Sequence, residues 1–151
     1  MSNILVTGGL GFIGSNFISK IIDKENLVVN IDSETYASID KSFLNFESNQ
    51  NYIYYNVDIS DYQKVNEIIK KYSFDRIFHF AAESHVDNSI ESSFEFCNTN
   101  VIGTLNLLES YRKLDKKHKL FIHVSTDEVF GSIKEGFFDE NSNYKPNSPY
   151  S

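Results

Sequence analysis

The chain has 151 residues, a length that indicates one domain rather than two. Its 14 basic residues stand against 21 acidic ones, so the net charge is −7, the wrong sign for a protein that binds nucleic-acid phosphates. Hydrophobic residues make up 40% of the chain and aromatic residues 15%. This composition excludes a disordered protein and predicts a folded domain with a packed core.

The cysteine content and the N-terminus indicate a cytoplasmic protein. Cys97 is the only cysteine, so an intrachain disulfide and a cysteine-rich zinc site are both excluded. It lies among apolar residues, and we expect it to be buried. The N-terminus lacks the basic and apolar regions of a signal peptide, and no apolar run is long enough to cross a bilayer. We expect no metal, no membrane and no nucleic acid as partners.

Short apolar runs in the sequence predict strands at 4–6, 27–31, 52–55, 77–80 and 120–124. Between most of them the apolar residues follow helical spacing, most clearly at Val65, Ile68, Ile69 and Tyr72. Ser60 and Gln63 have capping-box spacing in front of that helix. Alternating strands and helices predict an α/β fold with a parallel, doubly wound sheet.

Three further segments are less regular. A long helix is expected from about residue 94, with an apolar stripe formed by Phe94, Val101, Leu105 and Leu108. The connection 33–51 is interpreted as a loop, in which Phe43 and Phe46 can anchor a short helix. Residues 131–151 are polar and contain both prolines, so regular structure is expected to fade there.

A glycine triplet follows the first predicted strand. Gly8, Gly11 and Gly14 are three apart, which is the pattern of a turn that holds a dinucleotide pyrophosphate. Gly8 allows the tight turn, Gly11 allows close approach of the pyrophosphate, and Gly14 allows the helix to pack on the strand. The helix that begins near Phe12 and Ile13 offers free amide groups to the phosphates. The alternative is an ordinary glycine-rich turn between a strand and a helix.

An acidic residue stands at the end of the second predicted strand. Asp32 follows Gly14 by 18 positions, close to the spacing of the carboxylate that binds the adenosine ribose hydroxyls. No basic residue follows it before Lys41, so the sequence favours NAD over NADP. The alternative is a solvated carboxylate at a strand end. After the third strand, Asp58 and the amide of Ile59 are placed to contact the adenine, although Asp58 can equally be an aspartate at a helix start.

Three segments resemble motifs of the extended short-chain dehydrogenase/reductase family. Residues 7–14, Thr-Gly-Gly-Leu-Gly-Phe-Ile-Gly, are similar to its TGGxGFIG turn. Residues 80–87, Phe-Ala-Ala-Glu-Ser-His-Val-Asp, and 124–131, Val-Ser-Thr-Asp-Glu-Val-Phe-Gly, resemble the nucleotide-sugar 4,6-dehydratases of that family more narrowly. The resemblance covers the N-terminal half of such a protein. It implies that residues 1–151 form a Rossmann-type NAD-binding domain that stops before the substrate domain.

The resemblance also implies a reaction and roles for individual residues. NAD would oxidise C4 of dTDP-glucose or UDP-glucose, water would leave across C5 and C6, and the product would be a 4-keto-6-deoxy sugar nucleotide. Tyr150 matches the base for the 4-hydroxyl, and Thr126 matches the residue that binds this hydroxyl. Glu128 matches the base for the C5 proton, and Asp127 matches the acid that protonates the leaving C6 hydroxyl.

Other residues receive roles from the same motifs. Ala81, Ala82 and Ser84 are implied in cofactor binding, and Ser84 and His85 in substrate binding, although His85 can equally be an ordinary polar loop residue. Thr126 and Glu128 would share one face of an extended strand while Asp127 faced away. The chain must therefore leave extended geometry near Asp127 if all three are to reach one sugar.

Some alternatives stay open from the sequence. An epimerase or decarboxylase of the same superfamily is one, although epimerases usually carry small or hydroxyl residues in place of Asp127 and Glu128. A module that binds NAD without turnover is another. The lysine of the YxxxK motif that begins at Tyr150 would lie beyond Ser151, so the 151-residue chain is expected to be inactive by itself. The long helix from Phe94 implies a homodimer in the full-length protein.

Overall fold

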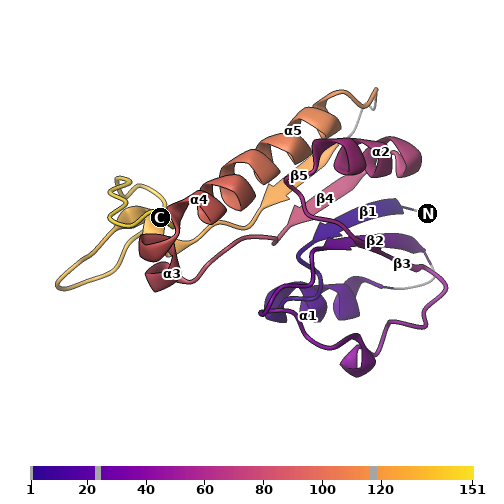
Figure 1. Ribbon diagram of the computed structural model, residues 1–151, viewed down its shortest axis with the longest axis horizontal. Helices are drawn as coiled ribbons and strands as arrows, with labels where there is room; N and C mark the ends of the chain where they lie inside the picture. The colour runs from indigo at the N-terminus through magenta and orange to yellow at the C-terminus, as the bar shows by residue number, and fades with distance from the viewer. Residues whose placement is uncertain (1, 23–24, 116–118) are drawn as a thin grey trace.

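The computed structural model describes residues 2–22, 25–115 and 119–151, and these contain one parallel sheet with the strand order β3-β2-β1-β4-β5 (Figure 1). The strands are β1 (Ser2–Thr7), β2 (Asn26–Asp32), β3 (Tyr52–Asn56), β4 (Arg76–His79) and β5 (Leu120–His123). All five predicted strands are present, with their ends shifted by a residue or two. The order is that of a doubly wound Rossmann-type sheet, as the sequence predicts.

The helices of the described residues connect these strands. They are α1 (Phe12–Ile21), α2 (Tyr62–Tyr72), α3 (Val86–Glu91), α4 (Ser93–Phe96) and α5 (Thr104–Arg112), with short 3₁₀ turns η1 (Lys41–Phe43) and η3 (Asp127–Phe130). A π-helical segment, η2 (Cys97–Gly103), joins α4 to α5 without a break. The long helix expected from residue 94 is therefore real, and it contains a wider turn in its middle.

Helices cover both faces of the sheet because β1 and β2 are apolar on both faces. Ile4, Val6 and Val28 pack with Ile18 of α1 on one face. Leu5, Val29 and Ile31 belong to the larger cluster on the other face, which includes the apolar residues of α2 and α5, Val65, Ile68, Ile69, Leu107 and Tyr111. Figure 1 shows α1 on one side of the sheet and α2 with α5 on the other.

The structure corrects two local predictions. The N-cap of α2 is Asp61, whose side chain accepts a hydrogen bond from Lys64 N, so Ser60 and Gln63 do not form the predicted capping box. A carboxylate one residue closer to the helix takes the cap position. Cys97 is exposed, not buried, because its neighbour Phe96 is the residue that faces the protein interior, at 2% exposure.

The loop between β2 and β3 is mostly irregular, as predicted. Its one turn of 3₁₀ helix, η1, begins at Asp40, whose side chain caps Ser42 N. Of the two aromatic residues expected to anchor a helix there, Phe46 is buried and Phe43 is 81% exposed. In the described part of the chain, no helix has both the length and the apolar character needed to cross a membrane.

Candidate functional site

The glycine turn after β1 lies directly against the loop after β4. Gly8 has φ of +72°, and a Cβ atom there would lie 2.6 Å from Ala81 N. Only glycine combines this backbone conformation with so close an approach. The turn is also tied to the end of β2, because Asn30 Oδ1 accepts from Gly9 N at 3.0 Å and Asp32 Oδ2 accepts from Leu10 N at 2.9 Å.

The N-terminus of α1 presents unpaired amide groups. The first hydrogen bond of the helix runs from Ser15 N to Gly11 O at 2.9 Å, so the amides of Phe12, Ile13 and Gly14 precede the helical ladder. The side chains of Phe12 and Ile13 are 78% and 60% exposed. These two residues can therefore contribute to an anion site through their backbone, and the helix dipole favours a negative charge there.

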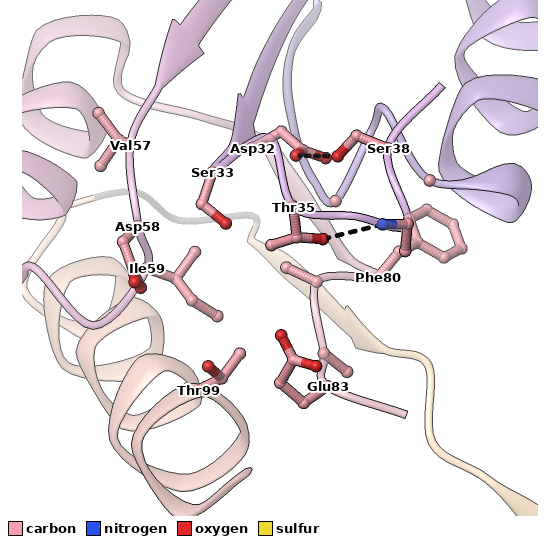
Figure 2. Close-up of a pocket in the computed structure, with 15 residues that line it drawn as sticks. Asp32, Ser33, Thr35, Ser38, Val57, Asp58, Ile59, Phe80, Glu83 and Thr99 are labelled. Carbon is pink, nitrogen blue, oxygen red and sulfur yellow. Dashed lines mark hydrogen bonds between the residues drawn. The ribbon is translucent and has the colours of Figure 1, made fainter. Parts of the chain in front are cut away.

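A pocket opens where the direction of winding of the sheet reverses, between β1 and β4. We call it the switch-point pocket (Figure 2). It is lined by Gly8, Gly11, Asp32, Ser33, Thr35, Ala37, Ser38, Val57, Asp58, Ile59, Phe80, Ala81, Ala82, Glu83 and Thr99. This is the position at which doubly wound sheets bind their ligands, outside the carboxyl ends of the strands. The structure thus brings together residues that the sequence places on four different loops.

Asp32 is nearly buried, at 7% exposure, and its carboxylate organises the rim of this pocket. Oδ2 accepts from Leu10 N, and Oδ1 accepts from Glu34 N at 2.9 Å and from Ser38 Oγ at 3.2 Å. A carboxylate has about four acceptor positions, so roughly one remains for a ligand hydroxyl. Asp32 is therefore not the solvated carboxylate of the alternative interpretation. Its hydrogen bonds within the protein also do not use all of its acceptor positions.

The opposite wall of the pocket is formed by the loop after β3. Asp58 is exposed, and its carboxylate accepts from Ser60 N at 2.8 Å, so it lines the pocket and also shapes the turn before α2. Ile59 is buried beneath it, 2% exposed. A Cβ atom on Gly103 would lie 2.5 Å from Ile59 Cγ1, so this glycine lets the long helix approach the pocket wall.

The segment Ala81–Ala82 separates the switch-point pocket from a second pocket and lines both. Thr7 Oγ1 accepts from Ala81 N at 3.3 Å. Glu83, the residue after this segment, is bound by Asn100 of the π-helical segment. The Asn100 side chain accepts a hydrogen bond from Glu83 N and donates one to Glu83 O, each at 2.9 Å. No local pattern in the sequence indicates this pair of hydrogen bonds, since the two residues are 17 positions apart.

Glu83 also lines the switch-point pocket, and the sequence analysis assigns no role to it. Burial raises the pKa of its carboxyl, and the charges of Glu95 and Asp58 raise it further. Thr99, Ser33 and Ser38 line the same pocket with hydroxyl groups. Together with the amides of the glycine turn, these groups make the pocket suited to a polar ligand with several hydrogen-bonding positions.

His79, at the end of β4, connects Thr7 of β1 to Thr104, which lines the second pocket. Its Nδ1 lies 2.7 Å from Thr7 Oγ1 and its Nε2 lies 2.9 Å from Thr104 Oγ1. The imidazole is buried, and burial lowers its pKa to about 4, with a smaller contribution from His123, whose ring centre is 5.0 Å away. His79 is therefore a neutral core histidine, while His123 is exposed.

The second pocket, which we call the Tyr150 pocket, lies between β5 and the long helix. It is lined by Ala81, Ala82, Asn100, Thr104, His123, Val124, Ser125, Thr126, Val129, Tyr150 and Ser151. Thr126 and Tyr150 thus share one pocket, although they are 24 positions apart in the sequence. The ring of Tyr150 contacts Phe96 edge-on, with 6.3 Å between the centroids.

The acidic pair follows Thr126 in the 3₁₀ turn η3. Thr126 Oγ1 caps this turn by accepting from Glu128 N at 3.2 Å. The chain therefore leaves extended geometry at Asp127, which is the geometric condition that the sequence sets for the acid and the base. Asp127 is exposed and Glu128 half-buried, and neither lines the Tyr150 pocket itself.

Ser84 and His85 lie outside the two pockets. Both are exposed, in the loop that leads into α3, and His85 stands at the N-cap position of that helix without a side-chain capping bond. Neither residue lines the switch-point pocket or the Tyr150 pocket. Their roles in cofactor and substrate binding stay predictions.

Comparisons with known proteins agree with this geometry. Residues 5–151 match the family model described as GDP-mannose 4,6 dehydratase. The chain belongs to this family. Among curated relatives, the dTDP-glucose 4,6-dehydratase of Haemophilus influenzae is 46% identical over 161 residues, and that of Salmonella typhimurium is 41% identical over 166 residues. These alignments include 100% and 98% of the chain but 48% and 46% of the relatives, so the chain spans about half their length.

Solved structures of the dehydratase family and of epimerases share the fold. A dTDP-glucose 4,6-dehydratase from Streptomyces venezuelae with NAD bound has a TM-score of 0.87 and 39% identity, and covers 98% of this chain and 47% of its own. The UDP-Glc/GlcNAc 4-epimerase from Campylobacter jejuni has a TM-score of 0.89 and 26% identity, with 99% and 45% covered. The Rossmann-type fold predicted from the sequence is confirmed.

Proposed function

We propose that residues 1–151 form the NAD-binding domain of a nucleotide-sugar 4,6-dehydratase. The observation that carries this proposal is the switch-point pocket, where the glycine turn, the free amides of α1 and the Asp32 carboxylate converge. The NAD complex of the Streptomyces venezuelae relative supports it. We further propose that the protein is cytoplasmic.

The residues of the pocket fit a dinucleotide in a definite orientation. Gly11 and the amides of Phe12 and Ile13 bind the pyrophosphate at the positive end of α1. Asp32 accepts a hydrogen bond from a ribose hydroxyl through its remaining acceptor position. Asp58 and the amide of Ile59 would contact the adenine. The segment Ala81–Ala82 would contact the cofactor between this pocket and the Tyr150 pocket, since it lines both.

The sugar nucleotide is proposed to be dTDP-glucose, which the names of several relatives indicate, and UDP-glucose is the alternative. When bound, NAD supplies the hydride acceptor for C4 and the donor for C6. Tyr150 removes the proton of the 4-hydroxyl and Thr126 holds that hydroxyl. Glu128 removes the C5 proton, and Asp127 protonates the C6 hydroxyl as water leaves.

A 4-epimerase is the second candidate, because the structural likeness to epimerases is as close as that to dehydratases. Epimerisation needs the oxidation of C4 but no acid and base for loss of water. Asp127 and Glu128, in a turn beside Thr126, therefore favour the dehydratase. The product distinguishes the two candidates, since only dehydration lowers the mass of the sugar nucleotide by one water.

Cofactor binding is tested first, by calorimetric titration of the chain with NAD and NADP. We expect NAD to bind more tightly, because the Asp32 carboxylate accepts a ribose hydroxyl and repels a 2′-phosphate. Asp32→Ala is expected to reduce this preference. Absence of NAD binding would contradict the proposed function, and equal binding of NADP would contradict the role of Asp32.

The acid and base are tested in a protein that joins these residues to the second half carried by the relatives. Glu128→Gln and Asp127→Asn are each expected to slow the loss of water by about 10²–10⁴-fold, while the oxidation of C4 is affected less. Stopped-flow absorbance at the NADH band would then show reduced cofactor accumulating. Unchanged elimination in both variants would exclude these two roles.

The 151-residue chain alone is proposed to bind cofactor without turnover. A tyrosine that acts as a base is helped by a nearby cation. Among the described residues that line the Tyr150 pocket, His123 is the only one with a basic side chain. Mass spectrometry after incubation with NAD and dTDP-glucose or UDP-glucose is expected to show no dehydrated product above a control without protein.

We also propose that the protein forms a homodimer through the long helix. Its apolar stripe is exposed, with Phe94 at 80%, Val101 at 57%, Leu105 at 50% and Leu108 at 43%. Contiguous apolar surface of this kind is typical of an interface between protein chains. Sedimentation analysis of the chain and of Leu105→Glu tests this, with the variant expected to be monomeric.

A further inference from the structure

A second acidic residue, Glu34, lies two positions after Asp32 and forms an ion pair with Lys41. Lys41 Nζ lies 2.6 Å from Glu34 Oε1 and 4.6 Å from the centre of the Tyr54 ring. Tyr54 donates from its hydroxyl to the same Glu34 oxygen at 2.7 Å. Glu34 thus receives hydrogen bonds from two side chains that come from different parts of the chain.

The conformation of Glu34 is unusual for its residue type. Its φ is +54°, in the left-handed region, where a side chain with a Cβ atom costs about 1 kcal/mol or more. Its amide donates to Asp32 Oδ1 at 2.9 Å, so the backbone at Glu34 is fixed by the carboxylate proposed to bind the ribose. The same turn therefore places Asp32 and orients Glu34 toward Lys41.

Lys41 lies in a pocket that adjoins the switch-point pocket. This Lys41 pocket is lined by Leu10, Glu34, Thr35, Ser38, Ile39, Asp40 and Lys41. Thr35 and Ser38 line both pockets, and Figure 2 shows the hydrogen bond from Ser38 to Asp32. Three residues of the Lys41 pocket, Leu10, Glu34 and Ser38, donate hydrogen bonds to the Asp32 carboxylate. The two pockets thus meet at Asp32.

A 2′-phosphate on the adenosine ribose would be placed next to Asp32, where the Lys41 pocket adjoins the switch-point pocket. In dinucleotide-binding domains that accept NADP, a basic residue near this position binds the phosphate. Lys41 is the only lysine or arginine among the described residues that line these two pockets. It is thus the one residue of either lining that can offer a full positive charge to that phosphate.

We infer that Glu34 is a specificity-determining residue, which excludes NADP by holding Lys41 away from the position of the 2′-phosphate. The inference rests on the proposed binding of NAD. Lys41 cannot serve the phosphate while Glu34 neutralises it and the Tyr54 ring lies beneath it. The pKa of Glu34 is lowered, first by its hydrogen bond from Lys41 and then by that from Tyr54, so the carboxyl is ionised and the pair is formed near neutral pH.

The test is a cycle of four proteins: the unchanged chain, Glu34→Gln, Lys41→Met, and the double variant. Calorimetry at low salt gives the ratio of the NADP and NAD dissociation constants for each. Glu34→Gln removes the charge that holds Lys41 while keeping the size of the side chain. We expect this variant to lower the ratio about fivefold, the effect of one exposed charge pair.

The double variant separates release of Lys41 from the simple loss of a negative charge. We expect Lys41→Met to change the ratio less than twofold in the unchanged chain, but to reverse most of the effect of Glu34→Gln in the double variant. The effect of Glu34→Gln should also shrink at 1 M salt, because exposed charges are screened. Circular dichroism of all four proteins checks that they are folded.

Two results would overturn the inference. One is an unchanged ratio in Glu34→Gln. The other is a double variant that behaves like Glu34→Gln alone, since Lys41 would then have no part in the selection. If the unchanged chain binds NAD and either result is found, only the inference fails. If the unchanged chain does not bind NAD, the proposed function fails, and the inference with it.

Discussion

The glycine turn and the acidic turn η3 are both proposed to bind reacting molecules, but the protein holds them in different ways. The glycine turn is anchored on two sides, since Asn30, which is fully buried, accepts from Gly9 N, and Gly8 lies against the backbone of Ala81. The acidic turn is held by the Thr126 cap and by a bond from Lys145 N to Val129 O at 2.9 Å.

This difference follows from where the two turns lie. The first lies at the centre of the sheet, where β1 has neighbours on both sides, whereas the second follows β5, which is partly exposed and lies at the edge of the sheet that the described residues form. Buried hydrogen bonds resist exchange with water, and exposed ones do not. The proposed cofactor site is therefore held by buried hydrogen bonds, while the turn of the proposed acid and base is held by hydrogen bonds of partly exposed residues and by the ring of Phe130, which stacks on Phe138.

The largest expected effect comes from Gly8→Ala. The new Cβ atom would meet Ala81 N and Cα in a backbone with φ of +72°, so strain and overpacking add up. We expect a loss of about 2–5 kcal/mol in the free energy of unfolding, measured by urea denaturation.

Gly136→Ala is the matched control for that variant, in the C-terminal region. Gly136 also has a positive φ, +94°, but a Cβ atom there meets only Ile133 Cδ1 at 3.9 Å. We expect a loss of about 1 kcal/mol or less, from the backbone conformation alone. Equal losses in the two variants would show that the glycine turn is no more constrained than the C-terminal segment.

The next effect is a dependence of stability on pH that arises at His79, which connects Thr7 near the glycine turn to Thr104 in the Tyr150 pocket. Its pKa falls from 6.5 to about 4 on folding. Between pH 4 and pH 6.5 the unfolded chain binds a proton at this residue that the folded chain does not. The contribution of His79 to the free energy of unfolding is therefore fully present above pH 6.5 and is lost as the pH falls toward 4. We expect a loss of about 2 kcal/mol between pH 7 and pH 5.

Urea denaturation at several pH values, on the unchanged chain and on His79→Gln, measures this contribution. The glutamine cannot take up a proton, so the variant is expected to lose less stability than the unchanged chain over the same interval. His123→Asn is the control, because His123 is exposed and makes only the smaller contribution to the His79 shift. Parallel curves for the unchanged chain and His79→Gln would contradict the assignment to His79.

The smallest effect is expected from Asn100→Ala, which removes both hydrogen bonds to the backbone of Glu83. The segment Ala81–Ala82 would then no longer be supported through the backbone of Glu83, while the hydrogen bond from Ala81 N to Thr7 Oγ1 would remain. We expect NAD to bind about tenfold more weakly, the effect of one or two net hydrogen bonds.

Asn100→Asp sharpens this prediction because it keeps the acceptor for Glu83 N but replaces the donor to Glu83 O with a charged oxygen that repels this carbonyl. Its affinity for NAD, measured by calorimetry, is expected to be as low as that of Asn100→Ala or lower. An NAD affinity that is unchanged in both variants would show that the hydrogen bonds from Asn100 to Glu83 do not position the segment Ala81–Ala82.

The sequence alone determined the order of strands and helices and the position of the glycine turn and Asp32. These features depend on local periods, since apolar residues repeat along a strand or helix face and a glycine turn needs only adjacent residues. The bend at Asp127 followed from strand geometry only together with the roles that the resemblance implies for Thr126, Asp127 and Glu128. The acidic motif was identified by resemblance.

Only the tertiary structure decided what depends on residues far apart in the chain. Asn100 binds the backbone of Glu83, Tyr54 donates to Glu34, and Ala81 lies against Gly8 because parallel strands and a long helix bring their ends together. The cap at Asp61 and the exposure of Cys97 were mispredicted for a related reason. Several residues had the right type for each role, and the packing of the complete chain selected among them.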